Sequence, residues 1–213
     1  LDQNDLGRSF FKRLQGQENT VYIDWENPEA NTFHLALEVT CHNGQDEFRP
    51  DVVVFINGLP LSYIEVKQPN AIRDGKTGIQ SEQDRTRYRF ENRKFRRFNN
   101  ITQLIALSDN LPYINGQGQQ KQGSYYGSNA YSKTKFNAFK EEREVDFLHS
   151  IGPLTDEQID FVLEDMKRFA LKSQPEFTTN LNHDTPCNAF LSSLYTKERL
   201  LFLLRFGLVY VEE

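Results

Sequence analysis

The stretch that decides the fold runs from residue 49 to residue 67 and reads Arg-Pro-Asp-Val-Val-Val-Phe-Ile-Asn-Gly-Leu-Pro-Leu-Ser-Tyr-Ile-Glu-Val-Lys. Its first half, residues 51–56, is an almost unbroken run of β-branched and aromatic residues, which is typical of a strand buried on both faces. Asn57-Gly58 is a strong hairpin-turn signal. Residues 61–67 form a second apolar run, and Pro69 ends it. The stretch therefore predicts two antiparallel core strands joined by a tight turn.

Three charged residues, Asp51, Glu65 and Lys67, interrupt these apolar runs. Glu65 and Lys67 share a face because side chains alternate along a strand. A two-residue loop at 57–58 would set Asp51 opposite Ile64, on the wrong face. A three-residue loop sets Asp51 opposite Glu65. We favour the three-residue loop, which would bring the two β-carbons to about 4.5–5.5 Å from each other.

Opposed carboxylates at that separation can share one hard divalent cation, and they would repel each other without it. Mg²⁺ prefers oxygen ligands and supports phosphodiester hydrolysis. Lys67, on the same face, could orient the attacking water or stabilise the developing oxyanion. The structural alternative is that these charges are solvated strand ends forming a surface ion pair. Their apolar surroundings favour the nuclease interpretation, because a buried charge without a partner is costly.

The run from Pro50 to Lys67, including Asn-Gly-Leu-Pro, resembles the N-terminal nuclease region of the restriction (motor) subunit of type I restriction–modification enzymes. That region belongs to the PD-(D/E)XK nuclease superfamily. The order of elements from residue 32 to residue 110 is similar too, including Ser108-Asp109-Asn110 after a strand. The resemblance implies endonucleolytic cleavage of double-stranded DNA with Mg²⁺ as cofactor. It implies Asp51, Glu65 and the Val66 carbonyl as metal ligands, and Asp51, Glu65 and Lys67 as catalytic residues.

The same resemblance implies a wider assembly. The family's subunit continues into helicase-like ATPase domains, and this sequence has no Walker-type phosphate loop, so ATP is expected only in those domains. The implied partners are these motor domains and the specificity and methylation subunits of the complex. One departure concerns the family's Gln-x-x-x-Tyr motif. Here Gln83 and Tyr88 are five positions apart, about 140° out of alignment on a helix, so Gln83 alone, or neither residue, would take that role.

Residues 85–97 carry seven Lys or Arg and one acid, Glu91, with aromatic residues interleaved. We expect this basic segment to contact the DNA backbone beside the hairpin. The alternative is a solvated helix whose arginines pair with acids elsewhere. The predicted DNA-contacting residues are Gln83, Arg85, Tyr88, Arg89, Arg93, Lys94, Arg96 and Arg97.

Outward from the hairpin, apolar periodicity and turn signals predict the remaining elements. Thr155 and Gln158 form a capping-box pattern, and Gly207 is a predicted helix stop. Residues 115–135 are rich in Gly, Gln, Ser, Tyr and Asn, which predicts a long mobile loop or a segment ordered by a partner. The predicted helices cover 2–14, 79–98, 155–172 and 192–206, and the further strands cover 32–40 and 101–107.

These elements predict an α/β fold with a mixed central β-sheet flanked by helices and a helical C-terminal part, and the resemblance implies that this fold is like that of restriction endonucleases. We divide the chain into a nuclease-like core over 1–150, which includes the polar loop, and a helical segment over 151–213 that leads toward the motor region. Leu1 stands where an initiator Met would be, so we expect a fragment of a longer protein.

Composition fits an ordinary globular chain, with 213 residues, 38% hydrophobic residues and a net charge of -5. The apolar runs are short, as at residues 200–204, so we expect no membrane span and no secretory signal. Cys41 and Cys187 lie far apart in the sequence, which favours a reducing compartment, the cytoplasm, over a disulfide framework or a zinc site that would add His42 and His183. Two other functions stay open: a non-catalytic DNA-binding and coupling module of a motor protein, and another PD-(D/E)XK nuclease of repair or defence.

Overall fold

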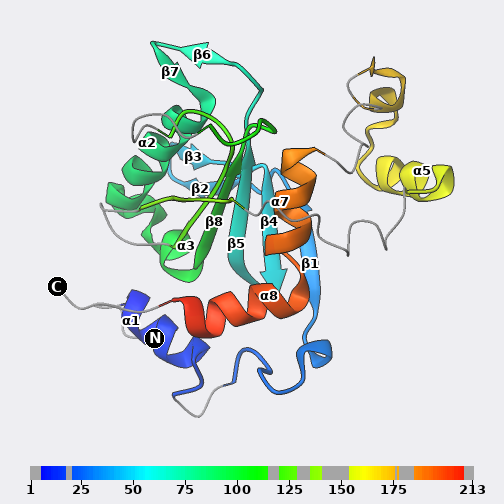
Figure 1. Cartoon of the computed structure of the whole chain (residues 1–213). Helices are drawn as coiled ribbons and strands as arrows, with labels where there is room; N and C mark the ends of the chain where they lie inside the picture. The colour runs from blue at the N-terminus through cyan, green and yellow to red at the C-terminus, as the bar shows by residue number, and fades with distance from the viewer. Residues whose placement is uncertain are drawn as a thin grey trace.

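A six-stranded mixed sheet forms the centre of the protein (Figure 1). The computed structural model describes residues 6–17, 21–114, 120–128, 135–140, 154–175, 177 and 185–208. In spatial order the strands are β1 (Phe33–Leu37), β4 (Val52–Ile56), β5 (Leu59–Val66), β8 (Leu104–Ser108), β9 (Ser124–Ser128) and β10 (Asn137–Ala138). β5 and β8 are parallel, and the other neighbouring strands are antiparallel. The predicted mixed α/β architecture is confirmed.

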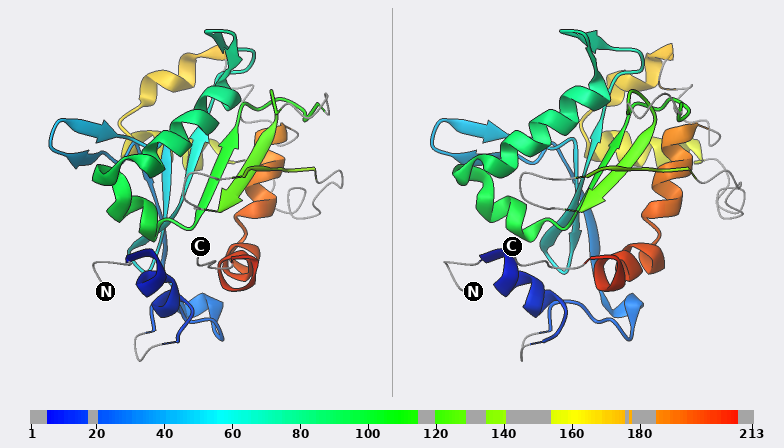
Figure 2. Two further views of the ribbon diagram at one scale, coloured as in Figure 1. Left: turned by 90° about the vertical axis from the view of Figure 1, so that its left-hand side faces the viewer. Right: turned by 60° about the vertical axis from the view of Figure 1, so that its left-hand side comes forward.

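Helices cover both faces of this sheet (Figure 2). One face packs against α2 (Gly78–Glu91), η2 (Arg93–Phe95) and α3 (Arg96–Ile101), and the other against α1 (Leu6–Leu14), α7 (Pro186–Leu194) and α8 (Lys197–Phe202). Alternation along β4 divides its residues between the two cores, with Val53 on the α2 side and Val54 and Ile56 on the α8 side. The strand buried on both faces is therefore present as predicted.

The smaller elements lie around this framework. Two short hairpins, β2–β3 and β6–β7, stand outside the main sheet. Figure 1 shows β6–β7 projecting beyond the end of β5, and α5 standing apart from the sheet. Their bounds, with those of the short helical turns, are η1 (Pro28–Ala30), β2 (Cys41–Asn43), β3 (Asp46–Phe48), β6 (Ile72–Arg73), β7 (Lys76–Thr77), α5 (Asp156–Asp165), η3 (Phe169–Ser173) and η4 (Leu203–Gly207).

The β4–β5 hairpin reaches the expected register by another route. Ile56 pairs with Leu59, so the loop has two residues rather than the predicted three. Both loop residues have positive φ, 50° at Asn57 and 79° at Gly58, which is the geometry that an Asn-Gly turn supplies. A bulge then places one extra residue, Leu61, in β5, and the register shifts by one, so that Val52 pairs with Ile64. The tight turn was right, and the three-residue loop was wrong.

The polar segment 115–135 is not a loop throughout, which corrects the sequence prediction. Residues 124–128 form β9, which pairs antiparallel with β8 and with β10. Tyr125 is fully buried, and the Ser124 hydroxyl lies 2.8 Å from that of Ser108. The prediction failed because it required aliphatic residues, whereas Tyr packs well in a strand and a paired Ser satisfies its own hydroxyl. Residues 115–119 and 129–134 of the segment lie outside the described part.

The packing of β9 can be tested at Gly127, because a β-carbon there would lie 2.9 Å from the Lys135 carbonyl oxygen and 3.2 Å from the Phe136 ring. We expect Gly127→Ala to lower the free energy of unfolding by about 1–3 kcal/mol, the usual cost of overpacking. Urea denaturation would measure it. Ser128→Ala, at the exposed end of the same strand, is the control and should change little. Equal stability of the Gly127→Ala and wild-type proteins would contradict the packing of β9 against 135–136.

Three predicted helices have different bounds in the structure. The helix predicted over 79–98 breaks at Asn92, whose extended backbone ends α2 and whose side-chain oxygen accepts a hydrogen bond from the Lys94 amide. The helix predicted over 192–206 is two helices, because the Thr196 side chain caps a new start by accepting from the Arg199 amide. The capping box at Thr155 is confirmed, but α5 ends at Asp165 rather than near residue 172. Local capping groups, which periodicity ignores, decide the boundaries at Asn92 and Thr196.

The C-terminal helices share a core with the sheet. Phe190 and Leu194 of α7 and Leu200 and Leu201 of α8 are buried against the β4–β5 side chains. Tyr195, between the two helices, places its hydroxyl 2.9 Å from that of Ser62 of β5. None of the helices in the described ranges has the length and apolar character that a bilayer crossing requires.

Candidate active site

The charged residues of the hairpin meet at the end of β5. Asp51 lies one residue before β4 and Lys67 one residue after β5. Val52 pairs with Ile64, and the next residues along the two strands, Asp51 and Glu65, therefore lie alongside each other. Asp51 is anchored there, because its Oδ2 accepts a hydrogen bond of 2.7 Å from the Val66 amide. The structure thus brings the predicted Asp51, Glu65 and Lys67 together.

Lys67 lies between the two carboxylates. Its Nζ is 2.7 Å from Glu65 Oε2 and 3.8 Å from Asp51 Oδ2. The start of α2 leaves room for the lysine stem, since a β-carbon at Gly78 would lie 2.9 Å from the Lys67 Cβ. A capping box between Thr77 and Gln80 fixes that helix start. The lysine stem therefore passes against the start of α2, and its ammonium lies within ion-pair distance of both carboxylates.

Burial changes the acidity of these groups. Only 3% of the Glu65 side chain is exposed, against 42% for Asp51. Desolvation and the neighbouring Glu82 raise the pKa of Glu65 to about 7, although Lys67 and Arg89 oppose the shift. Burial disfavours the charged form of Lys67, but Glu82 and Glu65 outweigh it and raise the pKa of the lysine. Lys67 is therefore an ammonium. Asp51 lies on the side of the site that is open to solvent.

Two more members of the site come from α2, and one of them, Glu82, was not among the residues predicted from the sequence. Glu82 is fully buried, with Oε2 3.1 Å from the Lys67 Nζ. Arg89 places Nη1 2.8 Å from Glu82 Oε1 and 3.3 Å from Glu65 Oε1, with its guanidinium 4.0 Å from the centre of the Phe48 ring. Glu82 and Arg89 are seven positions apart, two turns of one helix face. The signal that could have found Glu82 is that it shares this face with the buried Ile79 and Phe90.

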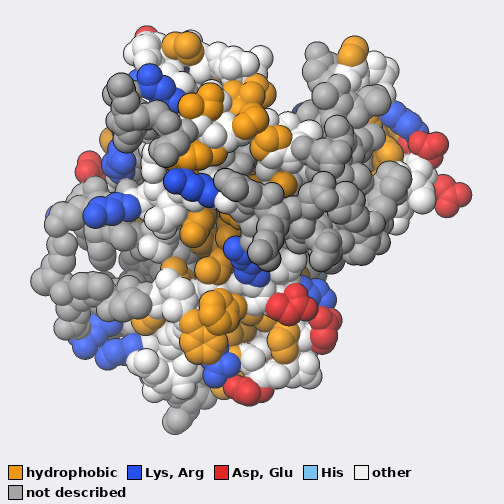
Figure 3. Space-filling view, viewed as in Figure 1, with side chains coloured by type: hydrophobic (Ala, Val, Ile, Leu, Met, Phe, Trp, Pro, Cys, Tyr) orange, Lys and Arg blue, Asp and Glu red, His pale blue; other side chains and the backbone are white. Residues whose placement is uncertain are grey.

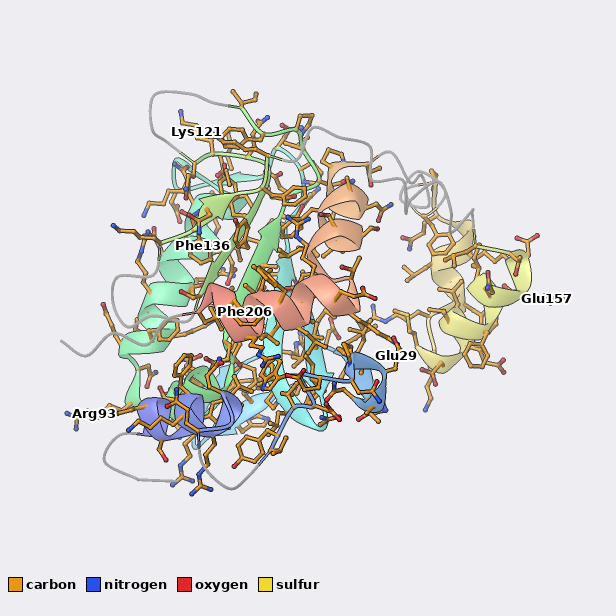
Figure 4. All side chains as sticks on the ribbon, turned by 60° about the horizontal axis from the view of Figure 1, so that its bottom comes forward. Glu29, Arg93, Lys121, Phe136, Glu157 and Phe206 are labelled. Atoms are coloured by element: carbon orange, nitrogen blue, oxygen red, sulfur yellow. The ribbon has the colours of Figure 1, made fainter. Side chains whose placement is uncertain are left out.

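The basic segment is divided between the site and the surface. Arg89, predicted to contact DNA, has only 14% of its side chain exposed and is paired within the site. Arg85 lies 3.5 Å from Glu82, and Lys94 lies 2.8 Å from Asp46. Arg93 and Arg97 are exposed, and Figure 4 shows Arg93 projecting away from the ribbon. The Arg96 side chain lies outside the described part.

Gln83 and Tyr88 point in different directions. Gln83 is buried and donates a hydrogen bond of 2.8 Å to Gln120, which in turn donates to the Phe136 carbonyl. Tyr88 is 65% exposed. The extra residue between them therefore prevents the two side chains from acting as one unit, and Gln83 ties α2 to the segment before β9.

The donor set fits a hard, water-rich cation. Asp51 and Glu65 offer carboxylate oxygens, and Mg²⁺ is commonly bound through one or two carboxylates while it keeps several waters. Within the described ranges, no three His, Cys, Asp or Glu side chains converge as a protein-only metal cage requires. Cys41 and Cys187 are free thiols, and His183 lies outside the described residues. The residues therefore fit Mg²⁺.

Comparisons with known proteins agree on one family. The profile of the family described as "Type I restriction enzyme R protein N terminus" matches residues 3–122, more than half of the chain. Two proteins of Methanocaldococcus jannaschii are similar, both named as candidate endonuclease subunits of type I restriction enzymes. The one called MjaIXP is 28% identical over 126 residues, which is 52% of this chain and 12% of the relative. The one called MjaVIIIP is 31% identical over 103 residues, 48% of this chain and 10% of the relative.

The chain therefore spans about a tenth of the length of these relatives. No solved structure gives a significant match. The matched residues 3–122 contain the β4–β5 hairpin, α2 and β8, and so the whole ionic site. On this match the chain belongs to the family of type I restriction enzyme R protein N-termini.

Proposed function

We propose that the chain is the endonuclease domain of a type I restriction enzyme R subunit, and that it cleaves double-stranded DNA with Mg²⁺. The observation that carries the proposal is the convergence of Asp51, Glu65 and Lys67 at one end of the β4–β5 hairpin. Family membership supports it, because both relatives are named as endonuclease subunits. Membership also disfavours an unrelated repair or defence nuclease.

Each residue then has a chemical role. Asp51 and Glu65 would hold Mg²⁺ through their carboxylates, with the Val66 carbonyl as a third oxygen. The bound ion would polarise the scissile phosphate and make water more acidic. Lys67 presents an ammonium on the same face, where it can orient the attacking water or stabilise the negative charge that develops on the phosphate. The half-exposed Asp51 side is the side from which DNA would approach.

The wider assembly is part of the proposal. In a subunit of the relatives' length, motor domains outside this chain would bind and hydrolyse ATP. The specificity and methylation subunits would choose the DNA site, so this chain needs no base-specific contacts. The cytoplasm, where the DNA substrate is found, is the proposed location.

A second candidate is the non-catalytic coupling module, and one observation favours it. The buried charges of Glu65, Lys67, Glu82 and Arg89 already neutralise one another without a metal ion. Calorimetric titration of the chain with Mg²⁺ or Mn²⁺ separates the two candidates. The nuclease proposal expects binding by the wild type and loss of binding in Asp51→Ala. A wild type that binds neither ion, or an Asp51→Ala variant that binds as well, would favour the coupling module.

The exposed part of the basic segment is the proposed DNA-contacting surface. Figure 3 shows Lys and Arg side chains on the side of the molecule that carries α2 and α3 and also elsewhere on this face, with acidic side chains on α5 and near α8. Arg93 and Arg97 are the exposed arginines at the end of the segment with described side chains. The segment packs on the same face of the sheet as Glu65 and Lys67, with α2 beside the site and the end of α3 beside Pro60 and Leu61 at the other end of β5.

Replacing Arg93, Arg96 and Arg97 together with Ala should weaken DNA binding to a similar degree for all sequences. The log–log salt dependence should flatten by about 0.9 for each phosphate that the variant no longer neutralises. Fluorescence anisotropy at several salt concentrations would measure both effects. The control is the pair Arg168→Ala and Lys172→Ala, which removes exposed cations near α5. An unchanged DNA affinity with an unchanged salt dependence would indicate that the segment is a solvated surface that does not contact DNA.

A further inference from the structure

Four charged side chains of the site form a closed ring of ion pairs. Glu65 Oε2 contacts Lys67 at 2.7 Å and Glu82 Oε2 contacts it at 3.1 Å. On the other side, Arg89 Nη1 lies 3.3 Å from Glu65 Oε1 and 2.8 Å from Glu82 Oε1. Each carboxylate therefore gives one oxygen to each cation. We call Glu65, Lys67, Glu82 and Arg89 the charge ring.

Glu82 is the innermost member of the charge ring. None of its side chain is exposed, whereas Lys67 and Arg89 are 18% and 14% exposed. Its Oε1 accepts no well-aligned hydrogen bond among the described residues, despite the nearby guanidinium. A buried carboxylate is costly unless cations compensate it. Glu82 cannot reach a phosphate or bulk water, so any role it has must be exerted through its cationic partners or the local field, and of these partners Lys67 and Arg89 are the buried ones, whereas Arg85 is 59% exposed and 3.5 Å away.

Lys67 and the expected metal ion compete for the same oxygens. The ammonium lies between Asp51 and Glu65, the two carboxylates that fit Mg²⁺. A cation held by these carboxylates would compete with Lys67 for Glu65, and two adjacent positive charges repel each other. Lys67 must then keep a different anionic partner or leave the site. The only carboxylate on its inner side among the described residues is Glu82, at 3.1 Å.

We propose that Glu82 is a positioning residue that retains the Lys67 ammonium when Mg²⁺ takes Glu65, and that Arg89 holds Glu82 for this purpose. The inference rests on the nuclease function proposed above. It explains why a fully buried acid is placed behind a lysine whose other partners are both metal ligands. The charge ring then keeps the Lys67 ammonium close to the carboxylates in both the free and the metal-bound site.

A double-mutant cycle on Mg²⁺ affinity tests this role, using calorimetry on the 213-residue chain. Without Glu82 the ammonium has no partner but Glu65 and Asp51, so Mg²⁺ must displace it entirely. We expect Glu82→Gln to weaken Mg²⁺ binding by about tenfold, within the usual range for coupled charges in contact. In a Lys67→Met background the same change should alter the affinity by less than about twofold, because the competing ammonium is gone.

Asp84→Asn is the matched control, since Asp84 is an exposed acid on the same helix that pairs with Lys76 and Arg87. It should leave Mg²⁺ affinity unchanged. The proposal is overturned if Glu82→Gln has no effect with Lys67 present, or if its effect is equally large without Lys67. The Asp51→Ala titration reports separately on the nuclease proposal, so the two failures are distinguishable.

A measurement on the wild type needs no change in the buried ring and keeps the proposal testable if Glu82→Gln fails to fold. Ammonium protons held by carboxylates exchange slowly with water and are visible by heteronuclear NMR. The Lys67 ammonium signal should persist, shifted, at saturating Mg²⁺. Its disappearance on addition of Mg²⁺ would mean that Lys67 leaves Glu82 and would overturn the proposal.

Discussion

On the proposed nuclease function, Asp51→Ala is expected to abolish DNA cleavage by the assembled restriction complex while ATP-driven translocation continues. The reason is position: Asp51 supplies one of the two carboxylates that fit Mg²⁺, and it lies in no ATPase motif. Its side chain is 42% exposed and outside the charge ring, so its removal leaves every member of that ring paired. Plasmid linearisation measures cleavage, and the rate of ATP hydrolysis measures the motor.

Glu65→Ala should also abolish cleavage, with a second effect that Asp51→Ala lacks. Glu65 is a buried partner of both Lys67 and Arg89. Removing one partner of a buried ion pair commonly costs about 3–5 kcal/mol of stability, so Glu65→Gln, which keeps the volume, is the better companion variant. Asp84→Asn on the exposed side of α2 should cleave as the wild type does. Normal cleavage by Asp51→Ala would exclude the proposed metal site.

Lys67→Ala is expected to reduce cleavage by about 100-fold or more, the usual effect of removing one preorganised stabiliser of developing charge. Mg²⁺ binding should be retained or tightened, because the ammonium that lies 2.7 Å from Glu65 competes with the ion. A lower cleavage rate together with retained or tighter Mg²⁺ binding distinguishes a catalytic lysine from a structural one. A thermal melt of the same variant shows whether the fold survives.

Either of two results would contradict this expectation. Cleavage at the wild-type rate would make Lys67 a structural partner of Glu65 and favour the coupling module. Loss of Mg²⁺ binding together with cleavage would mean that the lysine maintains the carboxylates rather than acting on water or phosphate. Lys76→Ala, which removes an exposed lysine paired with Asp84 near the start of α2, is the control for removal of a nearby positive charge.

Strand periodicity was enough to find the three residues of the hairpin, because a period of two fixes which side chains share a face. It did not predict the backbone path by which the hairpin brings these residues together. The turn has two residues, and a bulge at Leu61 supplies the shift that a longer loop was expected to supply. Two different backbone paths give the same pairing of Asp51 with Glu65, and the sequence pattern does not distinguish them.

For the segment around β9, the sequence pattern did not predict the strand at all. Its Ser and Gly residues do not favour a strand, and the segment forms one because its Tyr residues suit a strand, β8 offers an open edge and residues 135–138 pack against Gly127. Helix boundaries at Asn92 and Thr196 likewise depend on capping hydrogen bonds rather than on periodicity. Where the local signal is weak, the neighbouring elements decide the conformation.

The sequence by itself determined the mixed sheet, the buried hairpin and the shared face of Glu65 and Lys67, because these follow from short-range alternation and turn chemistry. Only the tertiary structure decided that Glu82 and Arg89 belong to the same site. Both come from α2, and although Glu82 shares a helix face with Ile79 and Phe90, the sequence does not show that this face packs on the end of β5. The physical reason is that burial is a property of the assembled fold: packing of α2 on the end of β5 removes Glu82 from water and makes Lys67 and Arg89 its necessary partners.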